Sequence, residues 1–318
     1  MSELTTKQYL LHKLAFFGGS SDDPATENLN QTLLDMFPAA VHKFDRDGNV
    51  PLHLAAASGN LKMIMLLGEK FASGASIRNE DGMLPLHFAI ASYGEIHGDS
   101  YGDDQEDGHD NPSPLRLVKT VLKFFPKAVA IPDNDGNLPI HLAVECLEGA
   151  LGVDVVYLLL DEADRQVQDP FGARFSNETK AEELRDETGS TITLSTEHET
   201  DSSVNADGRI VHCSMVRNSM GETPLITAIK TRNGWEIIEA IASGPGGKGG
   251  ALSQDADQNN ALHLLVGSEY QDPVAALSIV KAAPETASMR NAKGMLPIEV
   301  RIVHECSLFW CLIFQRVG

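Results

Sequence analysis

Three groups of residues have types and spacings that could support chemistry, and the first is an acidic cluster. Its members are Asp99, Asp103, Asp104, Glu106, Asp107 and Asp110. Carboxylates bind calcium, but these lack the D-x-[DN]-x-[DN]-G spacing with a glutamate at the twelfth position. We therefore interpret the cluster as a solvated charge run that keeps a loop extended.

A glycine-rich stretch, Gly244 to Gly250, is superficially similar to a phosphate-binding loop. It lacks the Ser or Thr that follows the lysine in such loops, and no buried strand precedes it. We interpret it as a loop that follows a helix over residues 235–242.

Histidines form the third group, because four of them share one position of a repeated motif: His53, His87, His141 and His263. One residue type at one motif position indicates a structural role, and two neighbouring histidines alone do not complete a zinc site. Gly-x-Ser-x-Gly and His-Glu-x-x-His motifs are absent, and Ser202 and Ser203 lack a motif context. We predict no catalytic residues, no metal ligands and no cofactor, and hence no enzyme.

Composition limits the choice of partners and compartment. The 318 residues include 25 Lys+Arg and 45 Asp+Glu, for a net charge of −20. That charge repels phosphate backbones and anionic lipids, so we expect no nucleic-acid or membrane partner. Four scattered cysteines without a C-x-x-C pair indicate reduced thiols. With no secretory signal and no apolar run of about 20 residues, we expect an intracellular protein, cytoplasmic or nuclear.

A repeated motif positions these residues. Asp47 to His53, Asp81 to His87 and Asp135 to His141 are near-copies, and three weaker copies follow. The six copies align on positions 48, 82, 136, 221, 258 and 294, with gaps of 34, 54, 85, 37 and 36 residues. Three gaps are one repeat long, and two indicate a repeat with an insertion.

Two further columns keep the same register. Three residues before each aligned position stands an Asp or Asn: Asp45, Asn79, Asp133, Asn218, Asp255 and Asn291. Such a residue followed by Gly at the fourth position predicts a type I turn, and Pro three residues later predicts a helix start. Phe-Pro or Ala-Pro pairs ten residues upstream predict the end of the preceding helix. Two short helices per copy follow, which need neighbouring copies to bury their apolar faces.

This pattern resembles the ankyrin repeat, over roughly residues 45–302 apart from the insertions. Pro-Leu-His-x-Ala stands at 51–55 and 85–89, and Pro-Ile-His-x-Ala at 139–143. The resemblance implies an all-α solenoid with projecting turns or β-hairpins, in which the motif histidine bonds to backbone between neighbouring turns. The family's threonine survives only at Thr223, so we expect the helix starts at Val50, Leu84, Leu138 and Leu296 to need another cap or water, and to be somewhat less stable.

We expect one domain over residues 1–318. An N-terminal capping helix pair spans 1–44, and repeats 1–3 span 45–160 with a first insertion at 97–113. A second insertion over 161–217 is acidic and of disordered composition, with a net charge of −8 between 161 and 209. Repeats 4–6 and the C-terminal end span 218–318, where an apolar tail from Leu308 to Phe314 either folds across the last repeat or meets a partner.

The resemblance implies a non-enzymatic protein-interaction module, a scaffold or adaptor, that binds through the turn tips and the concave face of the inner helices. The candidate partner-binding residues are Arg46, Asn49, Glu80, Met83, Asn134, Asn137, Ser219 and Glu222. An acidic second insertion on the same side favours a basic protein partner. The alternative is a regulatory subunit, or a fragment of a larger multidomain ankyrin protein, whose apolar C-terminal end docks onto a missing segment or partner.

Overall fold

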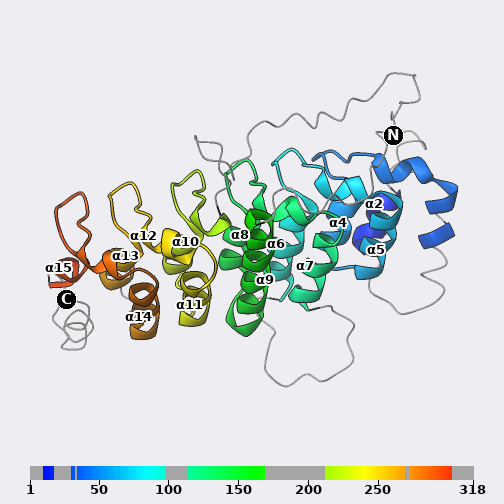
Figure 1. The fold of residues 1–318 in the computed structure, drawn as a ribbon. Coiled ribbons are helices and arrows are strands. Elements are labelled where there is room, and N and C mark those ends of the chain that lie inside the picture. Colours follow the sequence, from blue (N-terminus) through cyan, green and yellow to red (C-terminus); the bar gives the residue numbers. More distant parts are fainter. Residues whose placement is uncertain are drawn as a thin grey trace.

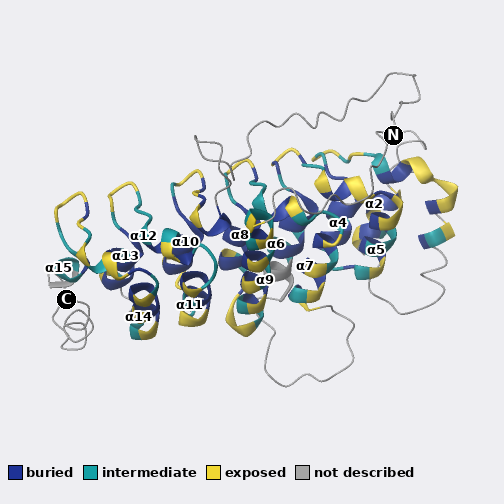
Figure 2. Ribbon diagram, viewed as in Figure 1, coloured by how far each residue is buried: buried dark blue, intermediate teal, exposed yellow. Residues whose placement is uncertain are grey.

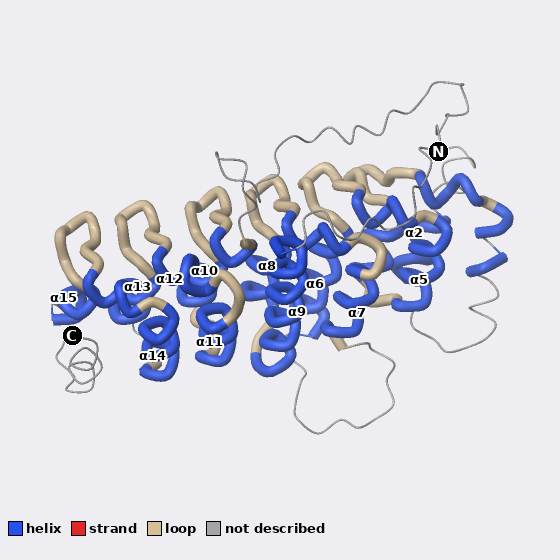
Figure 3. The backbone as a smooth tube through the Cα atoms, in the orientation of Figure 1, coloured by secondary structure: helices blue, strands red, loops and turns tan. Residues whose placement is uncertain are grey.

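The computed structural model describes residues 10–17, 30–32, 34–97, 113–168, 212–268 and 272–302 (Figure 1). Within these ranges the regular structure is helical, and the one β-type pairing is an isolated bridge between Gln254 and Asn260. The projecting elements of the described repeats are therefore turns, and the expected alternative of β-hairpins does not hold for them. Figure 3 shows these turns as a row of loops along one edge of the molecule.

Each of repeats 1–5 contributes an inner and an outer helix, and the described part of the sixth repeat contributes an inner helix. The inner helices are α4 (Pro51–Ala57), α6 (Pro85–His97), α8 (Pro139–Cys146), α10 (Pro224–Lys230), α13 (Ala261–Gly267) and α15 (Pro297–Ile302). The outer helices are α5 (Leu61–Lys70), α7 (Pro114–Leu122), α9 (Gly149–Gln168), α11 (Trp235–Ser243) and α14 (Pro273–Ala282). Each inner helix packs on the next inner helix, and each outer helix on the next outer one.

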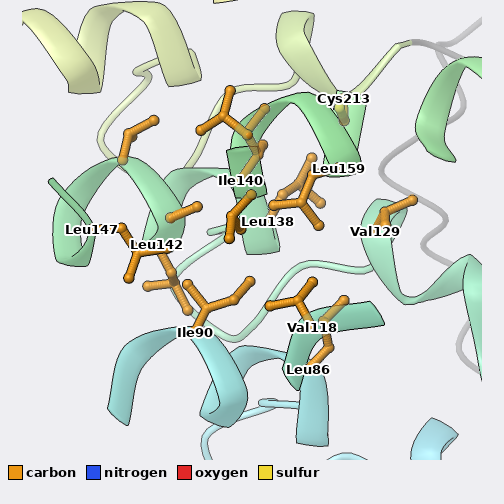
Figure 4. Close-up of a cluster of buried hydrophobic side chains, with 14 of the residues drawn as sticks. Leu86, Ile90, Val118, Val129, Leu138, Ile140, Leu142, Leu147, Leu159 and Cys213 are labelled. Carbon is orange, nitrogen blue, oxygen red and sulfur yellow. The ribbon is translucent and has the colours of Figure 1, made fainter. Parts of the chain in front are cut away.

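The core runs continuously between the helix pairs, because no pair could bury its apolar face alone. Leu86, Val118 and Ile140 come from α6, α7 and α8 and belong to one buried cluster (Figure 4). At the shared motif position, Ala55, Ala89, Ala143 and Ala228 are fully buried. A side chain this small allows neighbouring inner helices to approach closely.

An N-terminal element precedes the first turn. Helix α2 (Leu10–Phe17) packs against α4, and residues 30–32 and 34–36 are also helical. The Nε2 atom of His12 lies 3.0 Å from the carbonyl oxygen of Asn49. Helix α2 thus contacts the first turn in the same way that each inner helix with a motif histidine contacts the turn of the next repeat.

Between each outer helix and the following turn lies a short helical segment. Five are 3-10 helices: η1 (Pro38–His42), η2 (Ala72–Ser76), η3 (Pro126–Ala130), η4 (Cys213–Met215) and η5 (Pro284–Ser288). Proline at the start of three of them suits the first helical position, which needs no N–H donor. In the fifth repeat the α-helix α12 (Gly247–Leu252) takes this place, so the interpretation of Gly244–Gly250 as a loop is wrong from Gly247 onward.

The second insertion begins later than predicted. Helix α9 continues to Gln168, so residues 161–168 are helical, and residues 212–217 lead through η4 into the next turn. The first insertion, predicted at 97–113, is also slightly shorter than expected. Helix α6 extends to His97, and Ser113 caps α7 by accepting the amide of Arg116. Residues 98–112, which include the acidic cluster, and residues 169–211 lie outside the described residues, as does the apolar tail from Leu308.

All six turns have the predicted type I geometry. In each, the amide of the fourth residue donates to the carbonyl of the first, as Gly48 does to Asp45. The side-chain oxygen of the first residue accepts two further amides; Asp45 Oδ1 lies 2.9 Å from the nitrogen of Asp47 and 2.8 Å from that of Asn49. The same pair of bonds occurs at Asn79, Asp133, Asn218, Asp255 and Asn291.

The motif histidines link consecutive repeats, and they supply the missing caps. In His141, Nδ1 accepts the amide of Leu138 at 3.1 Å, and Nε2 lies 3.1 Å from the carbonyl of Glu222 in the next turn. This pairing fixes a neutral imidazole with its proton on Nε2. His53, His87 and His263 make the same two bonds in their repeats.

The expectation that the helix starts need another cap is thus met by histidine at Val50, Leu84 and Leu138. At Leu296, Glu299 accepts the amide instead, at 2.7 Å. A missing N-cap bond therefore gives no reason for lower stability at these four positions. Thr223, the one residue with the family's threonine, makes no side-chain cap bond.

Neighbouring turns are also joined directly, and we call each such connection between turns a joint. At four of the five joints, the amide of the second turn residue donates to the carbonyl of the third residue of the preceding turn, at 2.8–3.0 Å: Glu80 to Asp47, Asn134 to Asp81, Ser219 to Asp135, and Ala292 to Asp257. Asn79, Asn218 and Asn291 add side-chain bonds to the preceding turn, each at 3.0 Å. The joint between repeats 4 and 5 has none of these bonds among its described residues.

Candidate interaction surface

The turn tips form a row of exposed loops along one edge of the described structure (Figure 2). The second turn residues Arg46, Glu80, Asn134 and Ser219 are exposed, as predicted. Asn134 nevertheless has a structural bond, since its Nδ2 donates to the carbonyl of Glu80 at 2.8 Å. Half of the candidate residues therefore lie where a partner can reach them.

The fifth turn residues do not lie at the tips, which corrects the other half of the prediction. Asn49 and Glu222 are each only 5% exposed, and Met83 and Asn137 are half-buried. The fifth residue closes the turn, because its carbonyl accepts the amide of the first residue. Its side chain then faces a neighbour: Asn49 accepts a bond from Asn79, and Glu222 pairs with Lys230.

The third turn residues were missed by the sequence reasoning, although they are exposed. They are Asp47, Asp81, Asp135, Met220, Asp257 and Lys293. The two central residues of a type I turn lie at its tip, so the turn pattern alone was sufficient to select them. Met220 is the most exposed large apolar side chain in the described part of the chain, at 76%.

Charge along this edge is uneven. The central turn residues of repeats 1–3 include four exposed acids, Asp47, Glu80, Asp81 and Asp135, and one exposed base, Arg46. We call these four acids the acidic turn edge. The central turn residues of repeats 4–6 include one acid, Asp257, and one base, Lys293. The field of the described turns is therefore most negative over the first three repeats.

Two acids beside the turn edge have raised pKa values: Glu145 on the inner helix α8 and the turn residue Asp133. The pKa of Glu145 on α8 is raised by partial burial and then by the nearby charges of Glu222 and Asp133. Burial also raises the pKa of Asp133. A raised carboxyl pKa means that the ionised form lacks sufficient compensation. A cation placed here would supply it.

Apolar and small side chains occupy the rest of the inner face. One position on the inner helices is filled by Leu54, Phe88, Leu142 and Leu264, which are buried or half-buried. The ring of Phe88 meets His53 edge to face, with ring centroids 5.3 Å apart. The chemistry of this face is mixed, as expected for recognition of a protein surface.

The described residues offer no constellation for metal or covalent chemistry. Groups of three or more His, Cys, Asp or Glu side chains able to hold a metal ion are not found among them. His212 Nδ1 lies 2.9 Å from Ser214 Oγ, but both groups are buried. Burial raises the pKa of the neighbouring Cys213 thiol to about 12, so that thiol is a poor nucleophile. None of the described helices combines the length and the apolar composition that crossing a membrane requires.

Comparison with known families agrees with the geometry. Residues 47–80, from the first turn to the second, match the family model described as Ankyrin repeat. The chain is an ankyrin-repeat protein, a class that generally mediates protein–protein interaction and is typically non-enzymatic. No protein of curated function matches the sequence.

Proposed function

We propose that this protein is a non-enzymatic scaffold or adaptor that binds a basic protein partner through its acidic turn edge and the adjoining inner-helix face. The observation that carries the proposal is the acidic turn edge: four exposed carboxylates on three consecutive, mutually bonded turns. A rigid row of like charges attracts a complementary partner and fixes its register.

The proposal extends to the whole chain as an ankyrin-type solenoid with two acidic insertions, acting in the cytoplasm or nucleus. Residues 169–211 carry ten acids and four Lys or Arg. This segment connects α9 of the third repeat with η4, and η4 leads directly into the fourth turn. Both of its attachment points therefore belong to the third and fourth repeats. An acidic arm here adds to the attraction for the same basic partner.

Reversing the charge of the acidic turn edge tests this proposal. Partners are first captured from lysate at low and moderate salt and identified by mass spectrometry. We expect the triple variant Asp47→Lys, Asp81→Lys, Asp135→Lys to weaken the affinity of the captured partner at least tenfold at low salt, because attraction becomes repulsion. Isothermal titration calorimetry measures the affinity.

The matched control reverses three exposed acids on the outer helices: Glu69→Lys, Asp154→Lys and Asp161→Lys. It makes the same change in net charge away from the proposed surface, and we expect less than a threefold loss of affinity. A third variant deletes Glu178 to Asp207, which leaves α9 intact. Equal losses for the two triple variants would contradict a role for the turn edge, and unchanged binding of the deletion variant would remove the arm from the proposal.

A further inference from the structure

The joint between repeats 4 and 5 lacks every bond that joins the other turns. Neither the amide of Ala256 nor the carbonyl of Met220 takes part in the direct turn-to-turn bond found at the other four joints. The histidine position is filled by Ile226, which cannot donate to the carbonyl of Asn259. The first turn residue is Asp255, whose carboxylate cannot donate as the asparagines do.

The glycine environments show the same separation. A Cβ on Gly48, Gly82 or Gly136 would lie 2.8–2.9 Å from the amide nitrogen of the following turn. At Gly221, in the fourth turn, no described residue lies within 4 Å of that position. The fifth turn is thus not seated against the fourth, although the backbone of Gly221 has the same conformation, with φ +76°.

Beneath the open turns, the two repeats remain in contact. Outer helices α11 and α14 pack against each other, and Ile238, Ile241 and Ile279 are fully buried in the common core. Helix α12 packs on η4, where a Cβ on Gly250 would lie 2.8 Å from the carbonyl oxygen of Ser214. Inner helices α10 and α13 also pack against each other, so the joint is closed along the helices and open along the turns.

Two local features lower the resistance to bending at this joint. Helix α12 has glycine at three of its six positions, and each glycine costs about 1 kcal/mol relative to alanine in a helix. At the start of α10, the buried hydroxyls of Thr223 and Thr227 have no hydrogen-bond partner among the described residues. The histidine and turn-to-turn bonds that order the other repeats have no counterpart among the described residues of this joint, although Ser214 Oγ donates to the carbonyl of Pro245 below the turns, at 3.3 Å.

We infer that the joint between repeats 4 and 5 is a hinge. Repeats 5 and 6 pivot about the α11–α14 contact while the fourth and fifth turns open and close. Repeats 1–4, joined by histidine and turn bonds throughout, move as one unit. The motion changes the curvature of the inner-helix face between the acidic turn edge and the C-terminal repeats, so this face adapts to partners of different width.

Spin-label distance measurements test the hinge directly. Labels are placed at Met220→Cys and Ala256→Cys, with a control pair at Asp135→Cys and Ser219→Cys, the same two turn positions one joint earlier. Both pairs are built on a chain with Cys146, Cys306 and Cys311 changed to Ser; Cys213 is buried and stays. We expect the distance distribution across the hinge to be at least twice as wide as that of the control pair.

Amide hydrogen exchange on the unlabelled protein gives a second test that needs no substitution. The amide of Ala256 should exchange at least tenfold faster than those of Glu80, Asn134, Ser219 and Ala292, which occupy the same turn position and are bonded. Distributions of equal width overturn the hinge, and so does protection of Ala256 equal to that of its four counterparts.

Discussion

Replacing His141 with leucine should lower the free energy of unfolding by about 2–4 kcal/mol. The substitution leaves the buried amide of Leu138 without its partner, which costs about 1–3 kcal/mol. It also removes one of the two bonds to the carbonyl of Glu222, worth about 1 kcal/mol, while that carbonyl keeps the amide of Asn218. Leucine fills most of the volume, so the loss reports the two bonds more than a cavity. Urea denaturation followed by circular dichroism measures the change.

The fourth repeat provides the matched control. Ile226 holds the same motif position and is fully buried, but it makes neither bond, so Ile226→Leu should cost less than about 1.5 kcal/mol. If His141→Leu proved no more destabilising than Ile226→Leu, the histidine would be a packing residue, and the ladder of inter-repeat bonds would contribute little.

Acidification should unfold the protein through the same histidines. Burial lowers the pKa of His53 and His141 to about 4 and that of His87 to about 3, against about 6.5 in an unfolded chain. Between these limits the unfolded state binds more protons, so stability is fully present above about pH 6.5 and falls as the pH drops. Each histidine contributes on the order of 3 kcal/mol to this loss, and three together match the stability of an ordinary domain.

Raised carboxyl pKa values act in the opposite direction. Asp133 and Glu145 bind protons more readily in the folded state, which stabilises the fold as the pH falls through their titration range. Asp133 is only 5% exposed, but Glu145 lies at the surface, and two such carboxyls stand against three fully buried histidines, so we expect the histidines to dominate. Calorimetric unfolding at pH 5, in buffers of different ionisation enthalpy, should show uptake of about two protons. Proton release, or no exchange, would contradict neutral buried histidines.

The sequence alone predicted the repeat register and the turns correctly, because both depend on local chemistry. An Asp or Asn whose side chain accepts two nearby amides, followed by glycine in the left-handed region, has few alternatives to a type I turn. Position 258 shows how strong this preference is, since Gln258 adopts φ +58° in the place of the glycine.

The predictions that were wrong concern features that depend on contacts between repeats. The spacing of Asn49 and Glu222 places them in a turn, but only the neighbouring Asn79 and Lys230 explain why their side chains point away from solvent. Likewise, the low helix propensity of the glycines near 247 predicts a loop. In the structure these residues form a helix, because glycine allows its backbone to pack closely on η4. Inferring the hinge required both the sequence and the structure. The sequence shows Ile226 and Asp255, but only the structure shows that the bonds between the fourth and fifth turns are missing.

Hydrogen-exchange footprinting of the complex with the captured partner tests the central claim most directly. We predict that binding protects the turns at 79–83 and 133–137 and the exposed face of α6 and α8, while the outer helices α5, α7 and α9 exchange as in the free protein. Protection confined to the outer helices would place the partner on the opposite face. It would contradict binding through the acidic turn edge.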